Sequence, residues 1–460
     1  MKCPFVSETR IQTLEVLQAA NLLAKTAQNC PHMQSKASIH FDYNAFCEEK
    51  IAQRKSQGIF RTFKCMDKQV GLYPKVQWTN DASCAALPVT VWCSNDYLGM
   101  GTHPSVIRAM KEALEQFGAG AGGSRNIAGT CSLHFELEQE LASLHAKEAA
   151  LLFSSCYVAN ESVLETLSSM FPNCVIFSDA DNHASMIHGI RHSRATKHIF
   201  AHNDMKHLRN LLQSVPPKTP KIIALESIYS MCGTVAPLHE ILELAKEFGA
   251  ITFLDEVHAV GMYGIEGAGL AQEMNFNGHF DIISGTFGKA YGVSGGYIAA
   301  SKSIIDIVRN FAPGLIFTTA LSPVIAAGAL ASIQHLRKSS QERNLQRQNV
   351  AYLKQILRKN NIPFIQNQSH IVPIAVGNAQ IASRITQTLL EEHQIYAQCI
   401  NYPTVPMGTE RIRVVPGPLH TKELTDQLVQ ALSTIFSRLA VTQPQPQRPT
   451  NQKDRSNLII

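Results

Sequence analysis

A lysine lies in a run of small residues in the segment "SGTFGKAYG", residues 284–292. Lys289 has Gly288 and Ala290 as neighbours and follows the apolar stretch "DII". A lysine in a tight, partly desolvated site has a lowered pKa and forms Schiff bases with carbonyl compounds. Neighbouring glycines let a flat ring come close to the backbone. The segment therefore indicates carbonyl chemistry, although a lone lysine of this kind is more often an ordinary loop residue.

Two other segments also place polar groups directly after short apolar runs. In "ITFLDEVHA", Asp255 ends such a run and His258 follows three residues later. In "ALLFSSCYVAN", a turn rich in Ser and Cys precedes the helical pattern "ESVLETLSSMF". An acid at a strand end holds a protonated pyridine nitrogen, and a turn that opens a helix offers free N–H groups to phosphate. Alone, each is more typical of a solvated turn or a plain helix cap, but lysine, acid and phosphate turn together favour pyridoxal 5′-phosphate.

The elements that must position these groups alternate along the chain. The short β-rich runs are "ALLF", "CVIFS", "KHIFA", "KIIALES", "AITFLDE" and "FDIISGT". Longer segments such as "PLHEILELAKEFG" lie between them, with apolar residues at helical spacing and Gly249 as the stop. This alternation predicts an α/β fold with a mostly parallel sheet and helices on both faces. Ligands of such folds bind at the carboxyl ends of the strands, so the three segments are expected to open on one side.

Composition narrows the classes of function. The chain has 460 residues and a net charge of +5, which gives little support to nucleic-acid binding. No stretch approaches the roughly 18 apolar residues of a membrane span. The 11 cysteines form no CxxC pairs, which argues against a disulfide framework or a zinc site, so no metal site is predicted.

The pattern also predicts how the chain is divided. Residues 1–40 are expected to be a presequence-like segment with Cys-Pro dipeptides at Cys3 and Cys30. Residues 41–95 are expected to form an N-terminal arm, 96–335 a large cofactor-binding domain and 336–440 a smaller C-terminal α+β domain. Residues 441–460 are rich in Gln, Pro and charge, which predicts a disordered tail.

"DEVHAVGMYG" followed by "SGTFGKAYGVSGGYIA" resembles the α-oxoamine synthase family of fold-type I pyridoxal-phosphate enzymes. Supporting stretches from about residue 41 to 435 include "FRTFK", "VWCSNDYLGMG", "GAGAGGSRNIAGT", "LHFELEQELASLH", "SDADNHASMIHGIR", "FTTALSP" and "INYPTVPMGTERIRVVP". Within the family, "WCSNDYLGMG" and "INYPTVP" are most similar to the 5-aminolevulinate synthase branch.

The resemblance implies roles for the residues at matching positions. Lys289 carries the cofactor and moves the substrate α-proton, and Asp255 pairs with the ring nitrogen. His258 bonds the ring hydroxyl, and His183 stacks on the ring. The rest of the cofactor site is implied to comprise Cys156, Tyr157, Ser230, Thr286, and Thr318 and Thr319 of a second subunit. The implied substrate contacts are Asn95 and Arg413 for the glycine carboxylate, and Arg61, Ser124, Asn126, Ile127, Ser178, Lys197 and Thr404 for the acyl-CoA.

The implied protein is a homodimeric acyltransferase of the mitochondrial matrix. It would condense glycine with succinyl-CoA to give 5-aminolevulinate, CoA and CO2, the first step of haem biosynthesis. The Cys-Pro dipeptides are similar to haem-regulatory motifs of that branch, which makes Cys3 and Cys30 candidate haem ligands.

The sequence departs from the family pattern at two informative positions. Ser124 stands in "GGSRN" where the branch usually has Thr, as in sister synthases, and Cys232 in "SMCG" replaces a usual Asp. One alternative is therefore a sister synthase that uses another acyl-CoA, such as glycine C-acetyltransferase. Arg61 and Asn126 favour succinyl-CoA, because its carboxylate needs polar partners.

The other alternative is a catalytically inactive, haem-sensing homologue. This alternative is disfavoured because the four residues that the chemistry requires are all present: Lys289, Asp255, His258 and Arg413.

Overall fold

The computed structural model describes residues 40–57, 59–60, 62–79 and 86–439. The chain divides into two compact units, residues 1–61 and 62–460. In the first unit, helix α2 (Tyr43–Ser56) begins where the Asp42 side chain accepts a hydrogen bond from the Ala45 backbone N–H at 3.0 Å. None of the residues of α2 is buried. The presequence-like segment, both Cys-Pro dipeptides, Arg61 and the predicted C-terminal tail lie outside the described residues.

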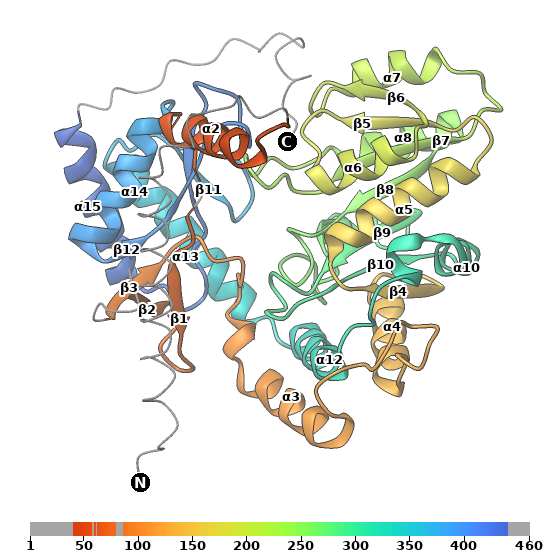
Figure 1. The fold of residues 1–460 in the computed structure, drawn as a ribbon, viewed down its shortest axis with the longest axis horizontal. Coiled ribbons are helices and arrows are strands. Elements are labelled where there is room, and N and C mark those ends of the chain that lie inside the picture. Colours follow the sequence, from red (N-terminus) through yellow and green to blue (C-terminus); the bar gives the residue numbers. More distant parts are fainter. Residues whose placement is uncertain (1–39, 58, 61, 80–85, 440–460) are drawn as a thin grey trace, which may run out of the picture. The chain divides into compact units, whose positions relative to one another are not determined.

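A seven-stranded sheet forms the centre of the second unit (Figure 1). Its strands are β4 (Ala149–Phe153), β5 (Val175–Asp179), β6 (Thr196–Phe200), β7 (Lys221–Glu226), β8 (Ile251–Asp255), β9 (Ile282–Thr286) and β10 (Gly296–Ala300). Their spatial order is β4-β10-β9-β8-β7-β5-β6. Strand β10 is antiparallel to both of its neighbours, and all the other pairings are parallel. The predicted mostly parallel sheet is confirmed.

Helices cover both faces of this sheet, as the alternation of strands and helices predicted. They are α3 (Pro104–Phe117), α4 (Ser132–Leu144), α5 (Cys156–Met170), α6 (Ala184–His192), α7 (Met205–Gln213), α8 (Leu238–Phe248), α9 (Leu270–Glu273), α10 (Lys302–Phe311), α11 (Pro313–Ile316) and α12 (Pro323–Lys338), with a 3₁₀ turn at Met100–Thr102. Neighbouring strand residues belong to different cores: Leu151 packs with α5, α6 and α10, whereas Leu152 packs with α4, α8 and α12. Gly249 ends α8 with a φ of 62°, as predicted.

The parallel strands end at one edge of the sheet, and this edge carries the polar residues. Asp255 ends β8, Thr286 ends β9, and Ser155 follows β4 as the N-cap of α5. Asp179 and Glu226 end β5 and β7 at the same edge. Because β4 and β9 are both antiparallel to β10, they run in the same direction. The structure therefore brings together the three segments that the sequence singled out.

Two smaller sheets accompany the large one in the second unit. One joins β1 (Cys65–Lys68), β2 (Lys75–Thr79) and β3 (Leu87–Val91) to β12 (Ile395–Tyr396), with β12 parallel to β3. The other contains β11 (Val372–Ala375), β14 (Arg411–Val414) and β13 (Gln398–Ile400). Helices α13 (Gln341–Lys359), α14 (Ala379–His393) and α15 (Lys422–Arg438) share a core with this second sheet and with Trp92. None of the described helices has the length and apolar character of a membrane span.

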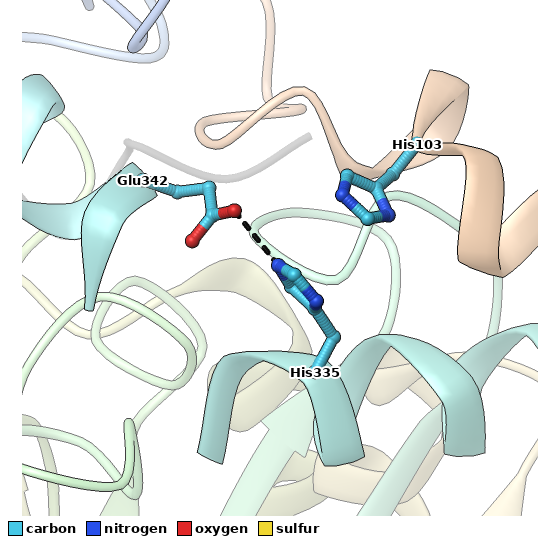
Figure 2. Close-up of side chains that lie close together, drawn as sticks. All are labelled: His103, His335 and Glu342. Carbon is cyan, nitrogen blue, oxygen red and sulfur yellow. Dashed lines mark hydrogen bonds and ion pairs between the residues drawn. The ribbon is translucent and has the colours of Figure 1, made fainter. Parts of the chain in front are cut away.

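A cluster of His103, His335 and Glu342 connects three helices away from the strand ends (Figure 2). His335 Nε2 of α12 lies 2.7 Å from Glu342 Oε1 of α13, and Ser339 donates to the other carboxylate oxygen at 2.7 Å. The His103 ring, which caps α3, lies 4.3 Å from the His335 ring, measured between centroids. The Nδ1 atom of His103 is already 2.7 Å from the Ser105 hydroxyl. These contacts fasten α3 and the start of α13 to the end of α12.

Candidate active site

A continuous line of hydrogen bonds leads from Lys289 to Arg413. Lys289 Nζ lies 3.0 Å from His258 Nε2, and His258 Nδ1 lies 2.9 Å from the Tyr97 hydroxyl. Arg413 Nη2 donates to the same hydroxyl at 2.8 Å. The phenol has one proton, and its hydroxyl donates to Asn95 Oδ1 at 3.4 Å. We therefore assign the His258 proton to Nδ1, which donates to the phenol oxygen, and leave Nε2 as the acceptor that faces Lys289 Nζ.

Burial sets the charge of two members of this line. It lowers the pKa of Lys289 to about 8, with a further lowering by Arg413 and an opposing effect of Asp255. The pKa of His258 lies well below its ordinary value, because burial and the positive charges of Lys289 and Arg413 disfavour an imidazolium. A neutral imidazole therefore stands between an amine and a guanidinium, and about a tenth of the amine is neutral at pH 7.

Arg413, on β14, is buried and is held by three oxygen atoms. Besides Tyr97, its Nη1 donates to Asn95 Oδ1 at 3.2 Å, and its Nε donates to the Ser230 carbonyl at 3.1 Å. None of these three partners is a carboxylate, so the positive charge is not neutralised by them. A buried guanidinium without a carboxylate is suited to an anionic ligand.

Asp255 is buried, and both of its carboxylate oxygens accept hydrogen bonds. Asn160 Nδ2 donates to Oδ2 at 2.6 Å, and the Val257 backbone N–H donates to Oδ1 at 2.8 Å. Burial raises the pKa of Asp255, while the Val257 N–H, the nearby His183 and the Asn160 amide oppose that rise. A cation placed against this carboxylate would favour its ionised form.

The first turn of α5 offers unpaired backbone N–H groups beside the same site. The Ser155 hydroxyl accepts from the Val158 N–H at 3.2 Å, and the helix continues through Cys156 and Tyr157. A Cβ at Gly296 would lie 2.2 Å from the Cys156 nitrogen, so only glycine lets β10 pass this close to the helix start. An N-terminal helix turn of this kind attracts phosphate.

Thr286 and His183 complete the part of the site formed by the sheet. The Thr286 hydroxyl donates to the Gly295 carbonyl at 3.1 Å and accepts from the Gly288 N–H at 3.1 Å, which shapes the turn before Lys289. His183 caps α6 and has an exposed ring. This geometry fits pyridoxal phosphate: an amine with a lowered pKa, a buried acid and a helix N-terminus lie at one sheet edge.

Among the predicted acyl-CoA residues, Asn126 and Ile127 are exposed. They follow Ser124, which forms an isolated antiparallel bridge with Thr319. Thr319 is exposed, and Thr318 is half-buried.

Three other predicted positions differ in exposure. Lys197 on β6 and Thr404 are exposed, whereas Ser178 on β5 is buried. The Ser178 hydroxyl accepts from the Asn182 amide at 3.0 Å and donates to the Asp179 carbonyl at 3.3 Å, so it is occupied within the protein. Ser178 is therefore the position whose predicted ligand role receives least support from the geometry.

Sequence reasoning missed three residues of the centre. Tyr97 connects His258 to Arg413, and Asn160 donates to Asp255. Tyr97 and Asn160 lie in the motifs "SNDYLGMG" and "SSCYVAN", but neither was assigned a role. Glu226 was also overlooked, although it ends β7 in register with Asp255. Burial and the nearby Asp255 raise the pKa of Glu226 well above its ordinary value, which favours its neutral form beside Asp255. Its position at a strand end was the signal that was available.

Comparison with known proteins identifies the family. The model of the family "Aminotransferase class I and II" matches residues 88–432. A Mus musculus protein named "5-aminolevulinate synthase, erythroid-specific, mitochondrial" is 49% identical over 416 residues, which cover 89% of this chain and 71% of the relative. The Candida albicans "5-aminolevulinate synthase, mitochondrial" is 44% identical, with 95% of this chain and 87% of the relative covered.

Solved structures of related enzymes share the fold. The Sphingomonas wittichii serine palmitoyltransferase superposes with a TM-score of 0.81 at 29% identity, covering 87% of this chain and all of that one. The Francisella tularensis 8-amino-7-oxononanoate synthase gives a TM-score of 0.64 at 24% identity over 76% of this chain and 98% of that one, which supports the fold alone. Both are consistent with the predicted fold-type I architecture. From the matched family model and the long, highly identical relatives, the chain belongs to the 5-aminolevulinate synthase family of pyridoxal-phosphate-dependent enzymes.

Proposed function

We propose that this protein condenses glycine with the succinyl group of succinyl-CoA, releasing CoA and CO2 and giving 5-aminolevulinate. The observation that carries the proposal is the line Arg413–Tyr97–His258–Lys289, which joins a buried cation to an amine with a lowered pKa. A small amino acid needs both groups at once: one for its carboxylate and one for the proton on its α-carbon.

The groups around Lys289 are those that would hold pyridoxal phosphate. Asp255 would accept the ring N–H, and the α5 N-terminus at Cys156 and Tyr157 would bind the phosphate with Thr286. His183 would cover the ring, and its Nδ1 is fixed at 2.8 Å from the Ser185 hydroxyl. When bound, the cofactor supplies a carbonyl for the lysine amine and a ring that withdraws electrons from the substrate α-carbon.

Arg413 binds and orients glycine. Its guanidinium is fixed by the Ser230 carbonyl and the Asn95 amide oxygen, so it offers a bidentate fork at little further loss of side-chain entropy. With the carboxylate held there, the α-carbon of the amino acid faces Lys289. Lys289 Nζ, as a neutral amine, would accept the α-proton.

His258 and Tyr97 position the groups that take part in this proton transfer. His258 is neutral, so it does not repel a protonated Lys289, and its Nε2 accepts a hydrogen bond from the lysine amine. The Tyr97 hydroxyl fixes that tautomer from the far side of the imidazole ring. Because Tyr97 also contacts Arg413, carboxylate binding and the proton-transfer group are aligned by one side chain.

The acyl-CoA would be bound by residues outside this line. We assign its contacts to Arg61, Ser124, Asn126, Ile127, Ser178, Lys197 and Thr404, on the matching positions of the family pattern. Thr318 and Thr319 would reach the phosphate in a homodimer with shared sites. The exposure of Asn126, Ile127 and Thr319 supports these roles, because each is accessible to a ligand or a second subunit.

The curated relatives are named mitochondrial, and we place this protein in the mitochondrion as an enzyme of haem biosynthesis. Haem binding at Cys3 and Cys30 is a proposal on residues outside the described part of the chain.

The deciding experiment incubates the purified protein with pyridoxal phosphate, glycine and a panel of acyl-CoAs, and identifies the product by mass. We expect 5-aminolevulinate with succinyl-CoA. A preference for acetyl-CoA would move the protein to a sister synthase, and no product with any acyl-CoA would support the inactive homologue. Arg413→Lys is the matched variant, because it keeps the charge and loses the fork; it should raise the KM for glycine more than that for succinyl-CoA.

A further inference from the structure

Cys232 belongs to a line of side chains that the proposed reaction does not use. It lies in the turn after β7, where its Sγ is 2.9 Å from the Thr234 hydroxyl. That hydroxyl is 2.8 Å from His202 Nε2, and His202 Nδ1 is 2.9 Å from Asp179 Oδ1. A carboxylate, an imidazole, a hydroxyl and a thiol therefore follow one another at hydrogen-bonding distance.

Asp179 fixes the orientation of the imidazole. Its side chain is only 1% exposed, and it also accepts from the backbone N–H groups of Asp181 and Asn203 at 2.8 and 3.0 Å. Burial alone would lower the pKa of His202, but the bond to Asp179 raises that pKa to about 10. His202 is thus strongly basic, and its Nε2 faces the hydroxyl that contacts the cysteine.

The surroundings of Cys232 also favour a negative sulfur. Burial would raise the pKa of Cys232, but His202 and Thr234 lower it below its ordinary value. Arg411, whose Nη1 donates to the Met231 carbonyl at 3.2 Å, adds a positive charge nearby.

Three acidic or phenolic groups also face this cluster. Asp181 Oδ2 lies 3.9 Å from His202 Nδ1 and supports the imidazolium. The Tyr229 ring meets the edge of His202 at 4.3 Å, and burial raises its pKa, so it stays neutral. Two acids near the sulfur oppose its ionisation. A carboxylate oxygen of Asp181 lies within 4.8 Å of Cys232 Sγ as well as of His202. Glu226 also faces Cys232, but burial raises its pKa, which favours its neutral form.

We propose that Cys232 is a modification site: a thiolate, formed by proton transfer through Thr234 to His202, that reacts with hydrogen peroxide. In forming the thiolate, the S–H proton passes to the Thr234 oxygen while the Thr234 proton passes to His202 Nε2. The sulfur then attacks one peroxide oxygen, so that an S–O bond forms and the O–O bond breaks. Hydroxide leaves and takes the proton from His202 to become water; sulfur loses two electrons and peroxide gains them, giving a sulfenic acid.

Oxidation there would reach the substrate site through two carbonyls of the same turn. The Ser230 carbonyl accepts from Arg413, and the Met231 carbonyl accepts from Arg411. An added oxygen on Cys232 should displace this turn and loosen Arg413. This consequence rests on the proposed function, whereas the reactivity of the thiol does not.

The test measures alkylation of the holoenzyme by iodoacetamide at pH 6–9 with peptide mass spectrometry. Cleavage after Lys and Arg gives residues 222–246 with Cys232 as the sole cysteine, and residues 385–411 with the half-buried Cys399 as the sole cysteine, a matched internal reference. We expect Cys232 to react at least about 10-fold faster than Cys399 at pH 7, with a midpoint below the ~8.5 of a free thiol.

Thr234→Val removes only the relay hydroxyl, and Thr234→Ser restores it. The valine variant should lose the pH 7 advantage and the serine variant should keep it, with cofactor absorbance as the check of folding. Equal reactivity of Cys232 and Cys399 in the wild type, or a valine variant with an unchanged pH profile, would overturn the thiolate relay.

A second arm adds hydrogen peroxide and then dimedone. The dimedone adduct is expected on the 222–246 peptide and should be absent from Cys232→Ser. Absence of the adduct from the wild type would overturn the peroxide step. A raised KM for glycine in the oxidised enzyme would support the effect on Arg413; an unchanged KM would remove that consequence and leave the thiol chemistry and the proposed function untouched.

Discussion

At the scale of single residues, each member of the line from Arg413 to Lys289 fixes the state of the next. Arg413 donates to the Tyr97 oxygen, and the Tyr97 proton goes to Asn95 Oδ1, which leaves His258 Nδ1 to donate to the same oxygen. His258 is kept neutral by burial, and Lys289 is left with a pKa of about 8. A neutral imidazole thus separates the guanidinium from the lysine amine.

The pH dependence of cofactor attachment should report the pKa of Lys289. With a pKa of about 8, about a tenth of the amine is neutral at pH 7, and only the neutral amine attacks a carbonyl. The rate at which cofactor-free protein captures pyridoxal phosphate should rise with pH through a midpoint of about 8 and then level off, as followed by stopped-flow absorbance. Arg413→Gln should move the midpoint upward, because a positive charge that lowers the pKa is lost. Equal rates at pH 6.5 and 9 would contradict the assignment.

Tyr97→Phe should show whether Tyr97 positions both Arg413 and His258 or only Arg413. The substitution removes a hydroxyl that is bonded to a charged Arg413, an interaction worth about 1.5–3 kcal/mol, or about 10–100-fold. We expect kcat/KM for glycine to fall in that range, with kcat reduced as well as KM raised, because His258 loses the partner of its Nδ1. Steady-state kinetics decide the point: a change in KM alone would show that Tyr97 only positions Arg413.

At the scale of elements, strand ends were predictable and long-range partners were not. Asp255 and Thr286 stand out because an apolar run stops at each of them, and the parallel sheet then brings them to one edge. Tyr97 and Arg413 are 316 residues apart, and no local pattern indicates their contact. The reversed direction of β10 was also hidden, because "GYIAA" is apolar throughout and a fully buried strand reads the same in either direction.

The cluster of His103, His335 and Glu342 should contribute to stability in a pH-dependent way. Burial alone would raise the pKa of Glu342, but the hydrogen bonds from His335 and Ser339 lower it. The stabilisation is therefore complete above the unfolded-state pKa of a glutamate and is lost as the pH falls through the lower folded-state value.

Glu342→Gln should lower the free energy of unfolding by about 1 kcal/mol at pH 7 in urea titrations. The difference from wild type should shrink below a pH of about 4.5. Glu112→Gln, at an exposed position of α3, is the control and should have little effect at any pH. A constant difference between pH 7 and pH 4 would exclude the ionised carboxylate as its source.

At the scale of the whole molecule, the line from Arg413 to Lys289 lies in one chain, whereas Thr318 and Thr319 are proposed to serve the neighbouring subunit. Dimers that combine two different variants show whether a residue serves the site of its own chain or the site of its neighbour. Lys289→Ala combined with the double variant Thr318→Ala, Thr319→Ala should recover activity, because one of the two sites then has both intact parts. Lys289→Ala combined with Arg413→Ala should recover none, because both defects belong to the same chain's site.

Activity of the mixed dimers should be measured after refolding the variants together, with each variant refolded alone as the reference. Recovery with the Arg413 variant, or none with the threonine variant, would reverse the assignment of residues to subunits.

The position of β10 in the sheet has a consequence for how the chain is made. Among the described strands, β4 pairs only with β10, and the partner of Phe153 is Gly296, 143 residues later in the chain. At a translation rate of about 5–20 residues per second, the ribosome needs about 7–30 seconds to supply that partner. During this interval Leu151 and Phe153 have no neighbouring strand, so the nascent chain exposes an apolar strand that chaperones can bind. The step that closes the sheet also brings Gly296 against the helix start at Cys156, so the turn proposed to bind phosphate is completed only when the chain is two-thirds synthesised.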